Sequence, residues 1–256
     1  MSASFLQARF APGCLFGGGS LTAILLTVAT YNTFQERKGR DPALDALLRD
    51  EETLSCLQEV GPARALGLKA SLGPQAVVSP AKYGLQYLAL VLPKGARFLQ
   101  RRAVSLNAHY GVLPKPWTLA RSYALLRAGQ RAWVDGLEPR VAQVVRLLWR
   151  GREIRVVHTH LPFEPWLRDR CLEMMPDLVG EGEALLVGDL NATIGDLFLA
   201  DLLLATGLRP AGSEEATHSS GRRIDFVLYR GSFREVGYGT ARSLSDHRLV
   251  RAKLEV

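Results

Sequence analysis

The sequence is divided into short apolar runs, rich in Val, Ile and Leu, by Gly, Pro and charged residues. Runs of this length without helical spacing are typical of buried strands. They predict strands at 21–31, 53–57, 86–92, 102–106, 140–148, 154–159, 184–187, 224–229 and 249–254. Helical patterns occupy 42–50, 166–179 and 196–205. Since strands and helices intermix without strict alternation, we expect an α/β fold with mixed or antiparallel sheets rather than a doubly wound parallel one.

The length of 256 residues suits one large domain with a substantial core. Residues 1–20 lack the apolar core that a signal peptide needs, so we interpret them as a flexible tail before a single domain over 21–256. The apolar run at 21–31 is too short to cross a bilayer. Three widely spaced cysteines form no disulfide or metal pattern, which favours a reducing, cytoplasmic location without membrane insertion.

The chain is basic, with 32 Lys and Arg against 25 Asp and Glu and a net charge of +7. Such a balance favours partners that carry phosphate, nucleic acid above all. Within an apparent insertion at 107–136, Arg121, Arg127 and Arg131 lie around a helical stripe of Leu and aromatic residues. One interpretation is a basic flap over a phosphate-containing substrate. The alternative is an amphipathic helix that packs on the sheet with its arginines in water.

Side chains that bind metals or move protons lie at or just after the ends of predicted strands: Asn32, Glu59, His158, His160, Asp189, Asn191, Asp225, Asp246 and His247. Alternate residues of an extended chain share a face, so His158 should lie beside His160, and Asp189 beside Asn191. Gly188, directly before this second pair, would let the backbone pass close to a substrate or metal.

These residue types suit one kind of chemistry. Asn, Glu and Asp supply the oxygen ligands that Mg²⁺ or Mn²⁺ prefers, and histidines can transfer protons near neutral pH. Asp225 stands among apolar residues, where a buried carboxylate needs a partner, and His247 is available as that partner. The set predicts metal-assisted attack of water on a phosphoester.

The ordered series "TYN", "LQEV", "HTHLP", "GDLNA", "RRIDFVL" and "SDH" resembles the endonuclease/exonuclease/phosphatase superfamily, from Asn32 to His247. The resemblance implies a four-layer α/β sandwich, in which two mixed sheets pack face to face with helices outside. It also implies that Glu59 is the principal Mg²⁺ ligand, with Asn32 beside it and Asp246 assisting the metal shell. His158, where the family often has Asn, would be structural or would tune the site.

The resemblance further implies that Asp189 and Asn191 bracket the phosphate and that His160 contacts it. His247, oriented by Asp225, would act as general base or electrostatic stabiliser, and Asp189 is the alternative base. We therefore expect a Mg²⁺- or Mn²⁺-dependent phosphodiesterase or phosphatase, with nucleic acid as the favoured substrate. A phospholipid headgroup or a small phosphorylated metabolite is the alternative substrate, and a binding module without catalysis is the alternative class.

Overall fold

The computed structural model describes residues 24–81, 85–106 and 140–256. Its strands are β1 (Leu25–Asn32), β2 (Thr53–Val60), β3 (Ala76–Ala81), β4 (Gln86–Val91), β5 (Arg97–Ser105), β6 (Val141–Trp149), β7 (Arg152–His160), β8 (Ala184–Asp189), β9 (Arg209–Pro210), β10 (Asp225–Arg230), β11 (Arg234–Ala241) and β12 (Leu249–Glu255). The helices are α1 (Pro42–Arg49), α2 (Pro62–Leu72), α5 (Pro165–Val179) and α6 (Leu197–Thr206), with two 3₁₀ turns at Phe34–Glu36 and Gly73–Gln75.

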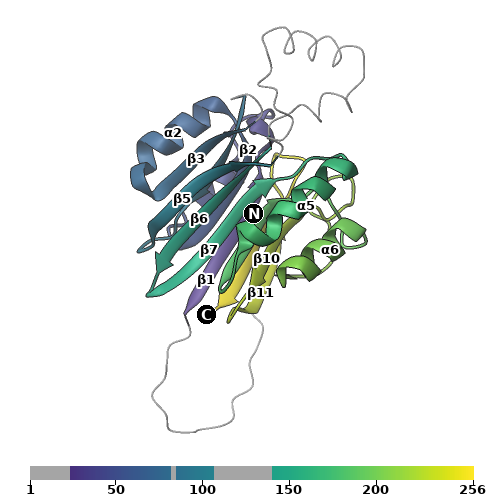
Figure 1. Ribbon diagram of the computed structural model, residues 1–256. Helices are drawn as coiled ribbons and strands as arrows, with labels where there is room; N and C mark the ends of the chain where they lie inside the picture. The colour runs from purple at the N-terminus through teal and green to yellow at the C-terminus, as the bar shows by residue number, and fades with distance from the viewer. Residues whose placement is uncertain (1–23, 82–84, 107–139) are drawn as a thin grey trace, which may run out of the picture.

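The strands form two six-stranded mixed sheets, which lie face to face in Figure 1. The first sheet has the order β11-β12-β1-β2-β4-β3, and the second has the order β5-β6-β7-β8-β10-β9. Each sheet has a parallel pair near its centre: β1 with β2 in the first, and β7 with β8 in the second. The other pairings are antiparallel, so the carboxyl ends of these two central pairs are natural places for a shared site.

Apolar side chains separate the structure into four layers. One cluster lies between the sheets and includes Leu26, Val28 and Leu54 from the first and Val156, Leu185 and Val187 from the second. A second cluster joins the outer face of the second sheet to α5 and α6. A third joins the outer face of the first sheet to α1 and α2. The predicted four-layer α/β sandwich with mixed sheets is therefore confirmed.

Each predicted strand and helix overlaps an observed one, but the sequence pattern does not predict α2, β3, β9 or β11. All three of these strands are sheet edges: β3 and β11 in the first sheet, and the two-residue β9 in the second. β11 is largely exposed and contains two glycines. The edge strand β5 begins at Arg97, five residues before the predicted start, and most of its residues are exposed. Edge strands bury little side chain on either face, which weakens the apolar run that marks a strand.

Helix starts follow the expected local chemistry. The Asp41 side chain caps α1 by accepting a hydrogen bond from Ala43 N at 2.9 Å, and Pro42 occupies the first turn. Pro165 has the same place in α5. Among the residues that the structure describes, none of the helices is both long and apolar enough to cross a membrane.

Residues 1–20 and the insertion at 107–136 both lie outside the described residues. The interpretations of these two segments therefore stay predictions. Arg121, Arg127 and Arg131, the predicted substrate contacts, lie in this part of the chain.

Candidate active site

The carboxyl ends of the two central parallel pairs meet across the sandwich. In the second sheet His160 is the register partner of Asp189. In the first sheet Asn32 ends β1, and Glu59 is the penultimate residue of β2. The two sheets are joined at this point because Asn32 Nδ2 donates a hydrogen bond to Asp189 Oδ2 at 3.2 Å.

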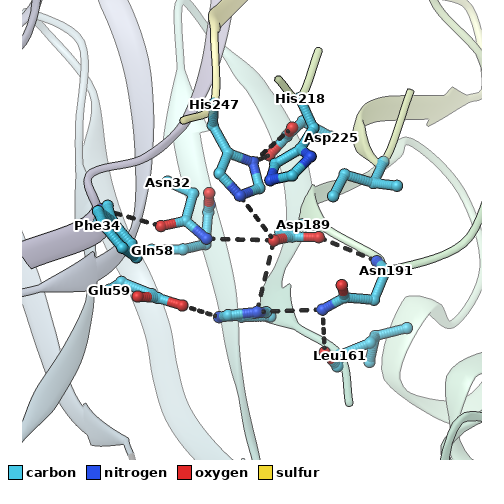
Figure 2. A network of polar contacts seen from close by, with 12 residues as sticks. Asn32, Phe34, Gln58, Glu59, Leu161, Asp189, Asn191, His218, Asp225 and His247 are labelled. Atoms are coloured by element: carbon cyan, nitrogen blue, oxygen red, sulfur yellow. Dashed lines mark hydrogen bonds and ion pairs between the residues drawn. The ribbon is translucent and has the colours of Figure 1, made fainter. Parts of the chain in front are cut away.

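Asp189 lies at the centre of this polar cluster, between Asn32 and Asn191 and beneath His247 in Figure 2. Its side chain is 2% exposed, and Oδ1 accepts a hydrogen bond from Asn191 N at 3.0 Å. Oδ2 lies 3.5 Å from His160 Nε2 and 3.7 Å from His247 Nε2. One buried carboxylate thus contacts four of the residues that the sequence analysis selected.

Asp225 and His247 form a buried pair above Asp189. His247 Nδ1 lies 2.9 Å from Asp225 Oδ2 and 3.1 Å from Oδ1. Asp225 is the first residue of β10, which begins one residue later than the predicted strand 224–229, and its backbone N donates to Thr217 Oγ1. Hydrogen bonding to the carboxylate fixes the His247 proton on Nδ1 and, when the ring is charged, presents a second N–H at Nε2 to Asp189.

Burial and charge shift both titrating groups of the centre. Burial, followed by the negative charge of Asp225, raises the pKa of Asp189 to about 7, against the lowering effects of His247 and the hydrogen bonds. Burial alone would lower the pKa of His247, but the hydrogen bond and charge of Asp225 outweigh it and raise the pKa to about 9. At neutral pH the imidazole is therefore charged, and the carboxyl group titrates near pH 7.

The pKa of His247 predicts how the stability of the metal-free protein depends on pH. The folded-state value of about 9 exceeds the ordinary 6.5, so this stabilisation is complete below pH 6.5 and is lost as pH rises through 9. We expect the free energy of unfolding to fall by about 1–3 kcal/mol over that window. Urea titrations below, within and above the window should show this loss in the wild type and not in His247→Gln. An equal loss in both proteins would contradict the prediction.

Asn191 reaches the cluster through a turn. The expectation that strand spacing aligns it with Asp189 is wrong, because β8 ends at Asp189 and Asn191 has a left-handed backbone with φ of 50°. Its Nδ2 donates to Leu161 O at 2.9 Å and lies 3.2 Å from His160 Nε2. His160 Nε2 thus lies between the Asn191 amide donor and the Asp189 carboxylate, so its role as acceptor or donor depends on the tautomer of the ring.

Gly188 also differs from expectation. A Cβ at this position would lie 1.8 Å from Thr159 O on the adjacent strand β7, and the backbone φ is +146°. The glycine is therefore required by close strand packing directly beside Asp189. Neither a substrate nor a metal is needed to account for it.

Two of the three predicted metal ligands, Asn32 and Glu59, lie at the ends of the neighbouring strands β1 and β2. Glu59 has φ of 50° at an irregularity in the β2–β4 pairing, and its Oε2 accepts a hydrogen bond from Gln86 Nε2 at 2.9 Å. Its Oε1 lies 3.9 Å from His160 Nδ1, beyond hydrogen-bond distance. Asn32 Oδ1 accepts from Phe34 N at 3.1 Å. All three residues, Asp246 included, present hard oxygen donors.

Asp246 lies beside a histidine that the sequence analysis did not select. His218 Nε2 is 3.5 Å from Asp246 Oδ2, and the His218 ring packs edge-on against His247 with centroids 4.7 Å apart. Within the described ranges, two groups of His and acidic residues bring ligand atoms within 4.8 Å: His218 with Asp246 and His247, and Asp189 with Asp225 and His247. Glu59 belongs to neither group. Since His218 follows no predicted strand, no pattern in the sequence indicates that it belongs to the site.

His158 is part of a buried network that links the two sheets behind the site. Its Nε2 accepts from Gln58 Nε2, and its Nδ1 donates to Gln143 Oε1, both at 2.8 Å. Gln143 Nε2 in turn donates to Ser79 Oγ at 3.0 Å. Burial lowers the pKa of His158 to about 3, so the ring is neutral. The network fixes the strands that carry Glu59 and His160, and the sequence analysis did not select its two glutamines.

A sequence profile described as the Endonuclease/Exonuclease/phosphatase family matches residues 29–247. No curated protein matches the chain. Among solved structures, an endonuclease/exonuclease/phosphatase from Bacteroides vulgatus has a TM-score of 0.70 and 18% identity, covering 91% of this chain and 99% of its own. A mannosyl-6-phosphatase from Bacteroides thetaiotaomicron has a TM-score of 0.65 and 16% identity, with 90% and 100% covered. D. rerio TDP2, complexed with a single-strand DNA product, has a TM-score of 0.63 and 13% identity, with 91% and 99% covered.

Proposed function

Since this chain belongs to the endonuclease/exonuclease/phosphatase family, we propose that it is a Mg²⁺-dependent phosphodiesterase that hydrolyses nucleic acid by in-line attack of water. Members of the family are phosphoester hydrolases, typically dependent on a divalent metal, and this chain is a phosphoester hydrolase. The observation that carries the finer proposal is the position of Asp189, buried between two histidines and two asparagines. That arrangement combines a titratable base with several groups able to bind a phosphate.

The carboxylate and amide oxygens of Glu59, Asn32 and Asp246 fit Mg²⁺ or Mn²⁺ by their chemistry. Glu59 Oε1 lies too far from His160 to form a hydrogen bond, and Asn32 Oδ1 can accept a contact beyond that of Phe34 N. Glu59, Asn32 and Asp246 would hold the cation, and the hard oxygen set disfavours zinc. When bound, the cation supplies positive charge to the phosphoryl oxygens and the leaving oxygen.

The two pKa shifts support Asp189 as the general base. A base with a pKa near 7 can accept a proton from water at neutral pH. His247 is already protonated there because its pKa is about 9, so it acts as a positive charge beside the phosphoryl group. Asp225 keeps that charge in place and oriented. Water oxygen forms the new bond to phosphorus, the P–O ester bond breaks, and Asp189 takes the proton of the attacking water.

The net charge of +7 favours a polyanionic substrate over a neutral or singly charged one. The similar structure of TDP2 holds a single-strand DNA product, which supports a nucleic-acid phosphodiester as the substrate class. Because a mannosyl-6-phosphatase has a similar structure, a sugar phosphate must be tested as a competing substrate.

A substrate panel with and without divalent metal tests this proposal. We expect turnover of single- and double-stranded DNA or RNA with Mg²⁺, loss of turnover in EDTA, and recovery when Mg²⁺ is returned in excess. Sphingomyelin, inositol phosphates and mannose 6-phosphate serve as competing substrates in the same assay. Turnover of one of these without any cleavage of nucleic acid would overturn the substrate, and full activity in EDTA would overturn the metal.

A further inference from the structure

An exposed aromatic side chain lies immediately beyond the active-site end of β7. Phe163 is three residues after His160, and its side chain is 54% exposed. The intervening chain is tied to the centre of the site, because Leu161 N donates to Asp189 O at 2.9 Å. The ring is therefore held close to the polar cluster, with about half of its surface open to a ligand.

An arginine from the opposite side of the site covers part of this ring. The Arg222 guanidinium carbon lies 5.8 Å from the centroid of the Phe163 ring, within cation–π distance. The backbone carbonyl of Arg222 accepts hydrogen bonds from Thr217 N and His218 N, both at 3.0 Å. Because His218 also packs against His247, Arg222 is anchored to the His247 side of the cluster as firmly as Phe163 is to the His160 side.

We propose that Phe163 and Arg222 form a stacking surface that binds the nucleobase next to the scissile phosphate. The inference rests on the proposed function and specifies its substrate as a nucleotide chain with at least one unstacked base at the site. An aromatic face with a neighbouring guanidinium is the combination that holds single-stranded nucleic acid without base-specific hydrogen bonds. The arginine adds a positive charge for the adjoining phosphate.

A sugar phosphate and an inositol phosphate gain less from such a surface than a nucleobase does. A sugar phosphate or an inositol phosphate offers no aromatic face to stack, and its hydroxyl groups would need polar partners instead. The exposed Phe163 ring therefore favours a base over a sugar in the position that adjoins the phosphate.

Binding of matched oligomers tests the stacking surface without requiring turnover. Fluorescently labelled single-stranded oligothymidylate is compared by anisotropy, in EDTA, with an oligomer of the same length and charge that lacks every base. We expect the wild type to bind the base-bearing oligomer about tenfold more tightly, in line with base–aromatic stacking. Phe163→Ala and Phe163→Leu should bind the two oligomers equally, and Phe163→Tyr should keep the preference.

Leu204→Ala is the matched control, because Leu204 is an apolar residue with 86% exposure on α6, away from the cluster. It should keep the wild-type preference. Equal binding of both oligomers by the wild type, or an unchanged preference in Phe163→Ala, would overturn the stacking surface. Failure of the proposed function gives a different result, namely absence of nucleic-acid cleavage in the substrate panel, whatever the binding preference.

Discussion

Replacement of Asp189 by asparagine is expected to lower kcat by about 10³-fold or more with the protein still folded, since general-base and charge contributions of this size are typical. Asparagine has the same shape, and its carbonyl oxygen can still accept the hydrogen bond that Asn191 N donates to Asp189 Oδ1, whereas its amide nitrogen cannot accept the one from Asn32 Nδ2. It cannot accept a proton from water. It also removes the negative charge that lies 3.7 Å from the His247 ring.

Steady-state kinetics of Asp189→Asn with excess Mg²⁺ provide the measurement, and thermal unfolding shows whether the variant is folded. We expect its melting temperature to stay close to that of the wild type, because removal of a buried carboxylate that is costly to ionise is offset by loss of the hydrogen bond from Asn32 and of the charge beside His247. Asp201→Asn, the same chemical change at an exposed position of α6, should leave kcat unchanged. Retention of more than about a tenth of wild-type kcat by Asp189→Asn would rule out its role as general base.

The apolar runs predict the central strands because those strands are buried from both sides. The residues of β8 preceding Asp189 are fully enclosed, between the inter-sheet cluster on one face and α5 and α6 on the other. A strand in that position requires continuous apolar sequence, which is readily recognised. An edge strand such as β11 does not require a continuous apolar sequence. The helix α2 has apolar residues on more than one side, including the exposed Leu66, so its pattern is not distinct either. They become visible only in the tertiary structure.

The site residues likewise fall into those that the sequence pattern indicates and those that it does not. Residues that end core strands, such as Asn32 and Asp189, could be selected from the sequence because a polar side chain interrupts an apolar run. Gln58 and His218 could not, since their positions in the sequence are unremarkable and their importance comes from neighbours that the fold supplies. The pKa values that distinguish Asp189 from His247 as the base also depend on burial and on Asp225, and thus on three-dimensional contacts.

Gly188→Ala is expected to destabilise the protein by about 3 kcal/mol, because both overpacking and an unfavourable backbone conformation contribute. The added Cβ would lie 1.8 Å from Thr159 O, and this atom belongs to the backbone of β7 and cannot move like a flexible side chain. The φ of +146° would in addition be strained for any residue with a Cβ. Relief of the contact requires β7 and β8 to separate at the point where His160 pairs with Asp189.

The change should therefore reduce both stability and activity. For a chain of this size we expect the melting temperature to fall by about 10 °C, and kcat should fall as well because the two strand ends no longer hold their side chains in register. Gly239→Ala is the matched control: Gly239 also lies in a strand, a Cβ there would meet nothing within 4 Å, and no positive φ is involved. Its melting temperature should stay within about 1–2 °C of the wild type, since exposed substitutions without strain cost little. If Gly188→Ala had the same melting temperature as Gly239→Ala, the close approach of β8 to Thr159 would not explain the glycine beside Asp189.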